Sequence, residues 1–229
     1  MSIEKFRSFA DAVEARIDTN ASYADQCMDN LRPSLIWMAT HLESDPPLPC
    51  DVLLRGCYGA AVEAVSLLSF GLVRPAVLSL RSHYELSLQY LYYKDHSVEW
   101  RSVMEYRSQP SLPATIKKYL KDNFPKFEKR FNKLSRVRTR KDEDCYQILS
   151  GIAHGTAINS ISSATEPADL IEAEEIVCQA VDVFHEVGEN TCDIHVASFE
   201  GNWISLPEGI KKDLKARFGE KRPRKELEL

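Results

Sequence analysis

Two charged side chains stand in the apolar stripe of a predicted helix, where they could form a site. Within residues 73–96, Arg81 and Glu85 lie one helical turn apart, and His83 falls on the opposite side. The side with the charged pair is otherwise apolar and aromatic: Val77, Leu78, Tyr84, Leu88 and Tyr92. A buried ion is costly unless it is paired and hydrogen-bonded. We therefore expect the pair to face the core, as a lock between helices or as the floor of a site.

A second helix, predicted over 142–161, carries Ser150 and His154 one turn apart, so both can point the same way. A histidine there could bond Glu85 and act as an acid or base, because its pKa lies near neutrality and a carboxylate tunes it. Arg81 would hold a phosphate or carboxylate with its planar fork. The four side chains are the candidate catalytic residues. The alternative is that they only satisfy one another and fix helix register.

Positive charge is concentrated in residues 115–141, which hold eleven Lys or Arg against two acidic residues. The whole chain has a net charge of −5, so the remainder is strongly acidic. Such asymmetry favours docking to RNA or to an acidic protein, and the alternative is a solvated basic helix. The candidate RNA- or partner-binding residues are Lys117, Lys118, Lys121, Lys129, Arg130, Lys133, Arg136, Arg138 and Arg140.

Helical periodicity dominates the chain, and alternating strand patterns are lacking. We predict an all-α fold: a single helical bundle over 1–218, built on long antiparallel helices, with a basic helical insertion at about 112–141 and a partly irregular C-terminus. Residues 219–229 are predicted to be a flexible charged tail. Pro33 predicts a kink or break. The predicted helices cover 3–17, 23–42, 50–70, 73–95, 97–107, two short stretches split near Pro125, 142–161, 167–196 and 207–218.

Composition indicates a cytoplasmic chain. The N-terminal residues lack the apolar core of a signal peptide, and no run of consecutive apolar residues is long enough for a membrane span. The six cysteines form no CxxC motif, so we expect reduced thiols. Cys178, His185 and Cys192 share seven-residue spacing, but one helix cannot easily converge four ligands on an ion. We therefore expect no metal and no other cofactor.

The helix containing LxLRSHYELSLQYLYY, paired with a later YQILSGIAHG helix, resembles the HEPN-like helical bundles, in particular the DUF5677 type of uncharacterised bacterial protein. The resemblance covers about residues 50–161 and rests on Arg81, Glu85, Ser150, His154 and Gly155. It implies an all-α fold, a homodimer and a role in toxin–antitoxin or phage-defence systems, where many members of the wider group are metal-independent RNases.

The chain departs from the motif of active HEPN RNases, in which an Arg and a His stand a few residues apart on one helix. Nothing suitable precedes His154, and Arg81 is followed by His83 too soon. Three hypotheses follow. The chain is a defence or toxin-type component that binds RNA or a partner protein, with RNA cleavage by His154 and Arg81 open. Alternatively, it is a non-enzymatic interaction module with a buried polar lock, or a small-ligand sensor.

Overall fold

Helices are the regular elements of this protein in a computed structural model that describes residues 2–43, 46–142, 144–154, 163–220 and 222–229. No strand occurs within these ranges. The prediction of an all-α fold is therefore confirmed.

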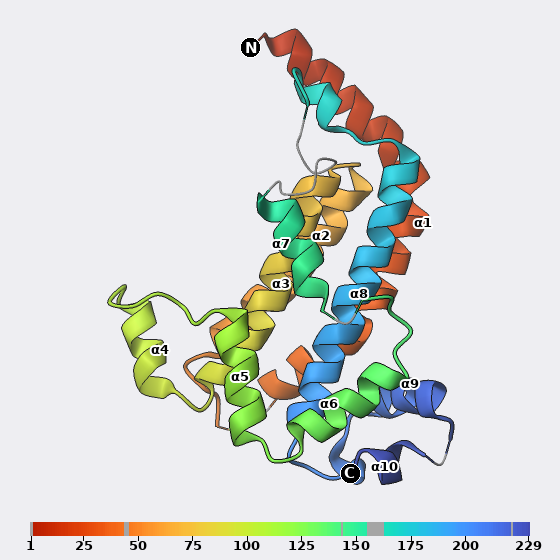
Figure 1. Cartoon of the computed structure of the whole chain (residues 1–229). Helices are drawn as coiled ribbons and strands as arrows, with labels where there is room; N and C mark the ends of the chain where they lie inside the picture. The colour runs from red at the N-terminus through yellow and green to blue at the C-terminus, as the bar shows by residue number, and fades with distance from the viewer. Residues whose placement is uncertain (1, 44–45, 143, 155–162, 221) are drawn as a thin grey trace.

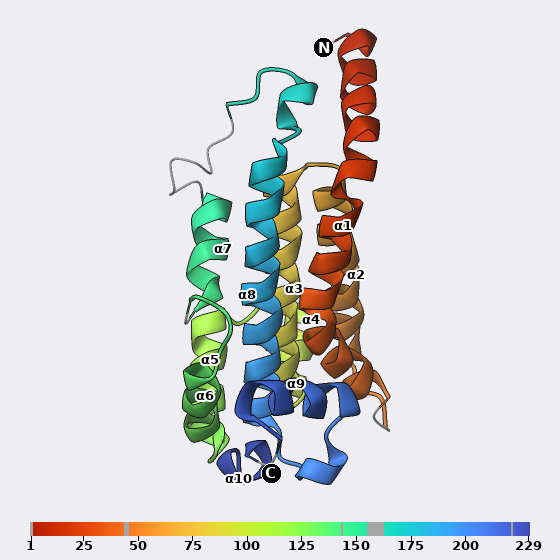
Figure 2. The same ribbon diagram turned by 90° about the vertical axis from the view of Figure 1, so that its right-hand side faces the viewer.

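Four long helices lie side by side and form the core (Figures 1 and 2): α1 (Ile3–Leu42), α2 (Asp51–Ser69), α3 (Val73–Tyr93) and α8 (Glu174–Ser198). α2 and α3 form the expected antiparallel hairpin. Gly71 joins them with φ 79°, a left-handed conformation that glycine adopts without strain. α1 and α8 run parallel to each other beside this hairpin. Trp37, Leu54, Leu80 and Phe184 are almost fully buried where these helices meet.

Shorter helices surround this core. α5 (Pro113–Asn123) packs on α3, α6 (Phe127–Arg136) packs on α8, and α7 (Cys145–His154) contacts both α3 and α8. α9 (Glu208–Phe218) crosses the end of the bundle (Figure 2). The remaining short elements are α4 (Ser97–Met104), η2 (Pro167–Leu170), η3 (Trp203–Ser205) and α10 (Pro223–Glu226).

The first helix differs from the prediction of two helices, 3–17 and 23–42, with a kink or break at Pro33 inside the second. α1 is continuous over its 40 residues. Asn20, at the predicted gap, is fully buried, and its side-chain amide donates to the Ser69 carbonyl at 3.3 Å. Leu31 and Ser34, on either side of Pro33, are also fully buried. Packing against α2 and α8 therefore outweighs the lost backbone hydrogen bond at the proline.

The C-terminal part also differs from the prediction. Pro167 begins the short η2 instead of the long helix, which begins at Glu174. Residues expected to form a flexible tail pack against the protein. Leu227 is fully buried, and Pro223 begins α10. Charge alone suggested a mobile segment there, whereas these two apolar side chains anchor it.

α2 is central to the fold, since it packs against both α1 and α3. By length and composition it could also cross a membrane, with a mean hydropathy of 1.3, a weak criterion that core helices meet as well. Its buried side chains include Leu54, Ala61 and Leu68, which belong to the hydrophobic core.

Among the glycines tested, Gly188 of α8 lies closest to the backbone of another helix. A Cβ atom built there would lie 2.0 Å from the Asn30 carbonyl oxygen of α1. At Gly56 of α2 a Cβ would lie 3.3 Å from Leu86 Cδ1 of α3, whereas at Gly59 it would meet nothing within 4 Å. Gly188 therefore sets the spacing of α1 and α8.

Gly188→Ala is expected to lower the free energy of unfolding by about 2–3 kcal/mol, because the methyl group meets backbone that cannot rotate away. Gly59→Ala is the matched control and should stabilise slightly, because alanine favours helix and the position is open. Urea unfolding of both variants measures the difference. Equal stability of the two variants would contradict close packing at Gly188.

Candidate functional site

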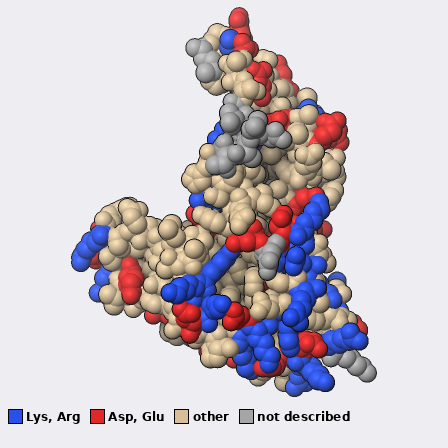
Figure 3. Space-filling view, viewed as in Figure 1, with Lys and Arg blue, Asp and Glu red and all other residues tan. Residues whose placement is uncertain are grey.

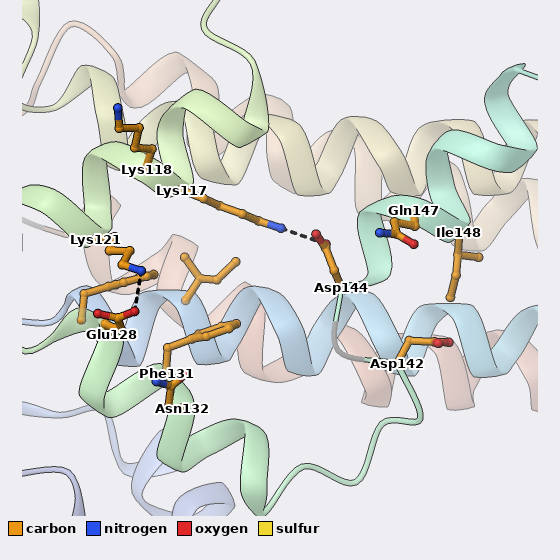
Figure 4. Close-up of a pocket in the computed structure, with 12 residues that line it drawn as sticks. Lys117, Lys118, Lys121, Glu128, Phe131, Asn132, Asp142, Asp144, Gln147 and Ile148 are labelled. Carbon is orange, nitrogen blue, oxygen red and sulfur yellow. Dashed lines mark hydrogen bonds and ion pairs between the residues drawn. The ribbon is translucent and has the colours of Figure 1, made fainter.

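A cleft of about 770 Å³ lies between α5, α6 and α7, with α8 behind it (Figure 4). It brings together three of the basic residues singled out in the sequence with side chains from helices far apart along the chain. The lining residues are Lys117, Lys118, Lys121, Phe127, Glu128, Phe131, Asn132, Asp142, Asp144, Gln147, Ile148 and Ile194. We take this cleft as the candidate functional site.

The amphipathic pattern of α5 positions the lysines. Ile116 and Leu120 are fully buried and fix the helix to the body of the protein. Lys117 and Lys121 lie one turn apart and share a face with the cleft, while Lys118 is exposed beside them. Burial of the two apolar residues therefore places the three lysines along the cleft, and the amines of Lys117 and Lys121 each reach a carboxylate of its lining (Figure 4).

Lys117 reaches across the cleft (Figure 4). Its Nζ lies 2.8 Å from Oδ1 of Asp144, just before α7, and 5.6 Å from the centre of the Tyr84 ring. The same carboxylate accepts the backbone N–H of Tyr146 at 3.1 Å, which satisfies a free donor at the start of α7. This half-buried ion pair ties α5 to α7.

Apolar side chains form the floor of the cleft. Phe127 and Phe131 lie one turn apart on α6, and their rings are stacked with centroids 5.7 Å apart. Ile194 of α8 is 1% exposed, and Ile148 of α7 is half-buried. The floor can therefore take an apolar group, provided that the group also fits the charged rim.

Charges of both signs surround this floor. Among the lining residues that the structure describes, the three lysines face three carboxylates, Glu128, Asp142 and Asp144. Lys121 pairs with Glu128 at 2.5 Å, whereas Lys118 makes no ion pair with a described residue. Basic and acidic side chains also alternate across the same face of the molecule (Figure 3). The cleft is therefore not a single-sign site.

The charged pair singled out on α3 is formed. Arg81 Nε donates to Glu85 Oε1 at 2.7 Å, and a terminal nitrogen of Arg81 donates to the Tyr146 hydroxyl at 3.1 Å. The guanidinium also lies over the Tyr146 ring, 5.3 Å from its centre. Burial raises the pKa of Tyr146, as does the Glu85 charge, so the phenol stays neutral beside the ion pair. Arg81 and Glu85 are half-buried, and Tyr146 joins them to α7.

The expected network with Ser150 and His154 does not form among the described residues. Ser150 is half-buried, His154 is exposed, and neither hydrogen-bonds to the pair on α3. The prediction chose the correct helix but the wrong turn: Tyr146 lies one turn before Ser150 on the same side. The second half of the predicted helix, 155–161, lies outside the described residues.

The buried face of α3 was predicted only in part: Val77, Tyr84 and Leu88 are buried as expected. His83, expected on the polar side, is fully buried, whereas Leu78, expected in the core, is 39% exposed. The reason is that α3 packs against α2 on one side and against α5 and α7 on another. A helix covered on several sides has no single apolar stripe from which to read its core face.

Three histidines, His41, His83 and His195, make polar contacts inside the bundle. Ser34 Oγ lies 3.0 Å from Nε2 of His83, and Ser87 Oγ lies 2.8 Å from Nε2 of His195. Nδ1 of His195 lies 3.2 Å from Nε2 of His41. Burial lowers the pKa of His41 to about 4, aided by Lys94, and burial also lowers the pKa of His83 and His195. These rings are therefore neutral hydrogen-bonding groups of the core.

Several basic residues proposed to contact RNA or a partner are used inside the protein. Arg130 is 4% exposed, and its Nε donates to the Leu227 carbonyl at 2.7 Å. Lys129 pairs with Glu228, and Lys133 donates to the Glu226 carbonyl at 2.5 Å. These three side chains hold the C-terminal residues against α6. Arg138 donates to the Ser135 carbonyl at 2.8 Å, and Arg136 is exposed.

Arg140 is the clearest correction, because its side chain is fully buried. It pairs with Glu189 at 2.9 Å and with Asp193 at 2.5 Å, both on α8. Carboxylates of α8 also accept backbone N–H groups of the segment that joins α6 to α7. Glu189 accepts from Thr139 at 3.0 Å, and Glu186 accepts from Lys141 at 2.6 Å. The basic segment was expected to offer a docking surface, but its last part is held against the carboxylates of α8.

The metal-ligand types on α8 do not converge. Cys178 is exposed, while Cys192 is buried. Within the described part of the chain, no group of three or more His, Cys, Asp or Glu side chains is placed to hold a metal ion.

Asp144 and Tyr146 are the site residues that the sequence did not single out. Both stand at the start of α7, where Asp144 binds Lys117 and Tyr146 binds Arg81. An acidic residue immediately before a helix is a recognisable N-terminal signal. Its contact with α5, however, depends on how the two helices pack.

Comparisons with protein-family models, with curated proteins and with solved structures find no match to this chain.

Proposed function

We propose that this protein is a non-enzymatic helical interaction module whose cleft between α5, α6 and α7 binds an amphipathic segment of a partner protein. The observation that carries the proposal is the combination of an apolar floor with a rim of mixed charge. Recognition of a helix in a groove uses this combination: the apolar face enters the groove, and the charges at the rim select the partner and its register.

The floor supplies the apolar part of such an interface. Phe131 and Ile148 border the cleft and remain partly accessible. Aromatic side chains at the centre of a concave surface are typical anchors of protein interfaces. Lys118, which has no ion-pair partner among the described residues, is available for an acidic group of the bound segment.

RNA is less suited to the same cleft. Phosphate contacts supply most of the affinity for nucleic acid and need an uncompensated positive groove. Here Asp144 neutralises Lys117, Glu128 neutralises Lys121, and Asp142 adds a further negative charge. A polyanion would have to break these ion pairs or lie beside carboxylates, whereas a peptide that carries both signs of charge would not.

The same reasoning favours a structural role for the pair on α3. Arg81 already binds Glu85 and Tyr146, so its guanidinium has little capacity left for a scissile phosphate. His154 is exposed and makes no contact with Arg81. RNA cleavage by these residues would require both a change of partner for Arg81 and a movement of α7.

The HEPN-like, DUF5677-type resemblance gives the proposal its biological setting. In that setting, the protein is a cytoplasmic component of a bacterial toxin or phage-defence system and acts by binding another protein of the system. The non-catalytic reading agrees with the missing Arg-to-His spacing on one helix.

Site-specific photo-crosslinking in native cells tests the proposal. Phe131 is replaced by a photoreactive phenylalanine analogue in the full chain, and the control carries the same analogue at Tyr106, which is 96% exposed outside the cleft. A protein adduct is expected from position 131 alone. The purified partner should then bind the Ile148→Asp variant about tenfold or more weakly than it binds wild type. Val98→Asp, at a 73% exposed position of α4, should bind like wild type.

Adducts of equal yield at both positions would contradict the proposal, because they would indicate contact without a preferred surface. So would full affinity of the Ile148→Asp variant for the partner. A thermal melt of this variant shows whether its fold is retained, and Gln147→Glu adds a milder change at the same wall.

A further inference from the structure

A second pocket, separate from the cleft, lies where α6, α9 and α10 meet and has a volume of about 280 Å³. Four of its seven lining residues are cations, Lys133, Arg136, Arg217 and Arg222, and Glu226 is the one carboxylate in this lining. The cleft balances its lysines with carboxylates, whereas this pocket has an excess of positive charge. On the face drawn in Figure 3, Lys and Arg side chains also gather at this end of the molecule.

The ends of three helices bring these cations together. Lys133 and Arg136 stand one turn apart in the last turn of α6, and Arg217 stands in the last turn of α9. Gly219 then ends α9 with φ 83°, a left-handed conformation that glycine adopts without strain. The chain turns back there, and the backbone N–H of Arg222 donates to the Gly219 carbonyl at 3.2 Å just before α10. This turn returns Arg222 to the pocket.

Two of the four cations are held by the protein itself. The side chain of Arg217 is 4% exposed, and its terminal nitrogens donate to Asp193 at 2.7 Å and 3.2 Å and to the Leu134 carbonyl at 3.2 Å. Lys133 donates to the Glu226 carbonyl at 2.5 Å, and its Nζ lies 3.3 Å from the carboxylate of the same residue. These two cations therefore shape the pocket, and their charges are already paired.

Arg136 and Arg222 differ from them, because neither side chain has a hydrogen-bond or ion-pair partner within the described ranges. Both are exposed, and they border the same pocket from different elements. Each guanidinium offers five N–H donors in a planar fork that matches the oxygens of a phosphate. The pocket therefore suits an anion that has two charges and several acceptor oxygens.

We infer that this pocket binds the phosphate group of a small phosphate monoester through Arg136 and Arg222. Such a monoester carries close to two negative charges at neutral pH, because its second pKa is about 6. A carboxylate carries only one charge and would leave one of the two guanidinium groups unpaired. Phe218, half-buried in the same lining, offers an apolar contact to the organic part of the ligand. A pocket of this volume holds a small molecule, whereas a nucleic acid needs an extended groove.

Isothermal titration calorimetry of the full chain with phenyl phosphate, at pH 7.5 and constant ionic strength, tests the inference. Wild type should bind one equivalent. Benzoate, which has the same ring but a single charge, should bind about tenfold more weakly. Arg136→Gln and Arg222→Gln should each weaken the binding of phenyl phosphate about tenfold. Arg74→Gln is the matched control and should bind like wild type, because Arg74 is an exposed residue in the first turn of α3, outside the pocket.

Glu226→Gln supplies a change in the opposite direction. It removes the carboxylate from the lining and keeps the backbone carbonyl that binds Lys133, so it should strengthen the binding of phenyl phosphate several-fold. The variants of Arg136 and Arg222 should melt at the wild-type temperature, because their side chains make no described contact that a fold would lose. Absence of binding by wild type, an equal loss in Arg74→Gln, or benzoate binding as tightly as phenyl phosphate would overturn the inference.

Discussion

Replacing Asp193 with asparagine is expected to lower the free energy of unfolding by about 3–5 kcal/mol, the range seen when one member of a buried ion network is removed. Asp193 is fully buried and accepts from Arg140 at 2.5 Å and from Arg217 at 2.7 Å. Burial opposes the charge of Arg217, but the carboxylate of Asp193 and those nearby outweigh it and raise the pKa of Arg217. The asparagine would leave two buried cations short of one negative charge.

Asp182→Asn is the matched control on the same helix. Asp182 pairs with Lys141 at 2.5 Å, but both side chains are well exposed, at 64% and 76%. Exposed pairs of this kind contribute little, so the control should unfold like wild type. Urea denaturation at pH 7 compares the two variants. A loss at Asp193 no larger than at Asp182 would mean that the buried network does not hold α6, α8 and α9 together.

Acidification from pH 7 to pH 5 is expected to destabilise the protein steeply. His83 and His195 are fully buried, and burial lowers the pKa of both rings. The folded state keeps them neutral, whereas the unfolded chain binds protons below its ordinary histidine pKa of about 6.5. Their contribution is therefore complete above about pH 6.5 and is lost as the pH falls toward their folded values.

Two such histidines give a slope of about 3 kcal/mol per pH unit below pH 6, and His41, whose pKa is lowered to about 4, adds to it. Free energies of unfolding from urea titrations at several pH values measure this slope. His83→Gln removes one of these rings and should lower the slope by about 1.4 kcal/mol per pH unit. A stability that is flat between pH 7 and pH 5 would contradict the buried, neutral histidines.

Glu189 of the buried ion network acts in a lower pH window than the histidines. Burial alone would raise the pKa of Glu189, but Arg217 and the hydrogen bonds from Thr139 outweigh it, so the pKa is lowered. The stabilisation by this group is present above its ordinary pKa and is lost only as the pH falls through the lower folded value. The loss between pH 7 and pH 5 is therefore assigned to the histidines.

Helix periodicity and breaker residues predicted the local structure well. The hairpin about Gly71 and the helix after Pro207 were placed close to their observed bounds, and the two short basic helices are split near Pro125 as predicted. Of the kink or break expected at Pro33, the break does not occur, because burial of Leu31 and Ser34 keeps α1 continuous. The residue pattern within one helix indicates its intrinsic helix propensity. Whether a proline ends the helix also depends on the contacts that other helices make with it.

The candidate site was predicted less well, because its contacts join different helices. Arg81 and Glu85 were paired correctly, since both lie on one helix. Their partner on α7 depends on how far α7 is shifted along α3, and residue spacing within one helix does not give that shift. The buried role of Arg140 likewise depends on the packing of its loop against α8. An excess of Lys and Arg in a segment therefore does not reveal how much of that charge is free.

The central claim is that the cleft beside Phe131 binds a protein segment. The most direct measurement is digestion of the adduct formed by the photoreactive residue at this position, with protease in one half of the sample and ribonuclease in the other. Mass spectrometry then measures the mass added to the peptide that carries the photoreactive residue. We predict that this added mass is that of a peptide and that ribonuclease treatment leaves it unchanged. An adduct whose added mass is nucleotide, and which ribonuclease trims, would contradict the proposal and favour RNA as the ligand.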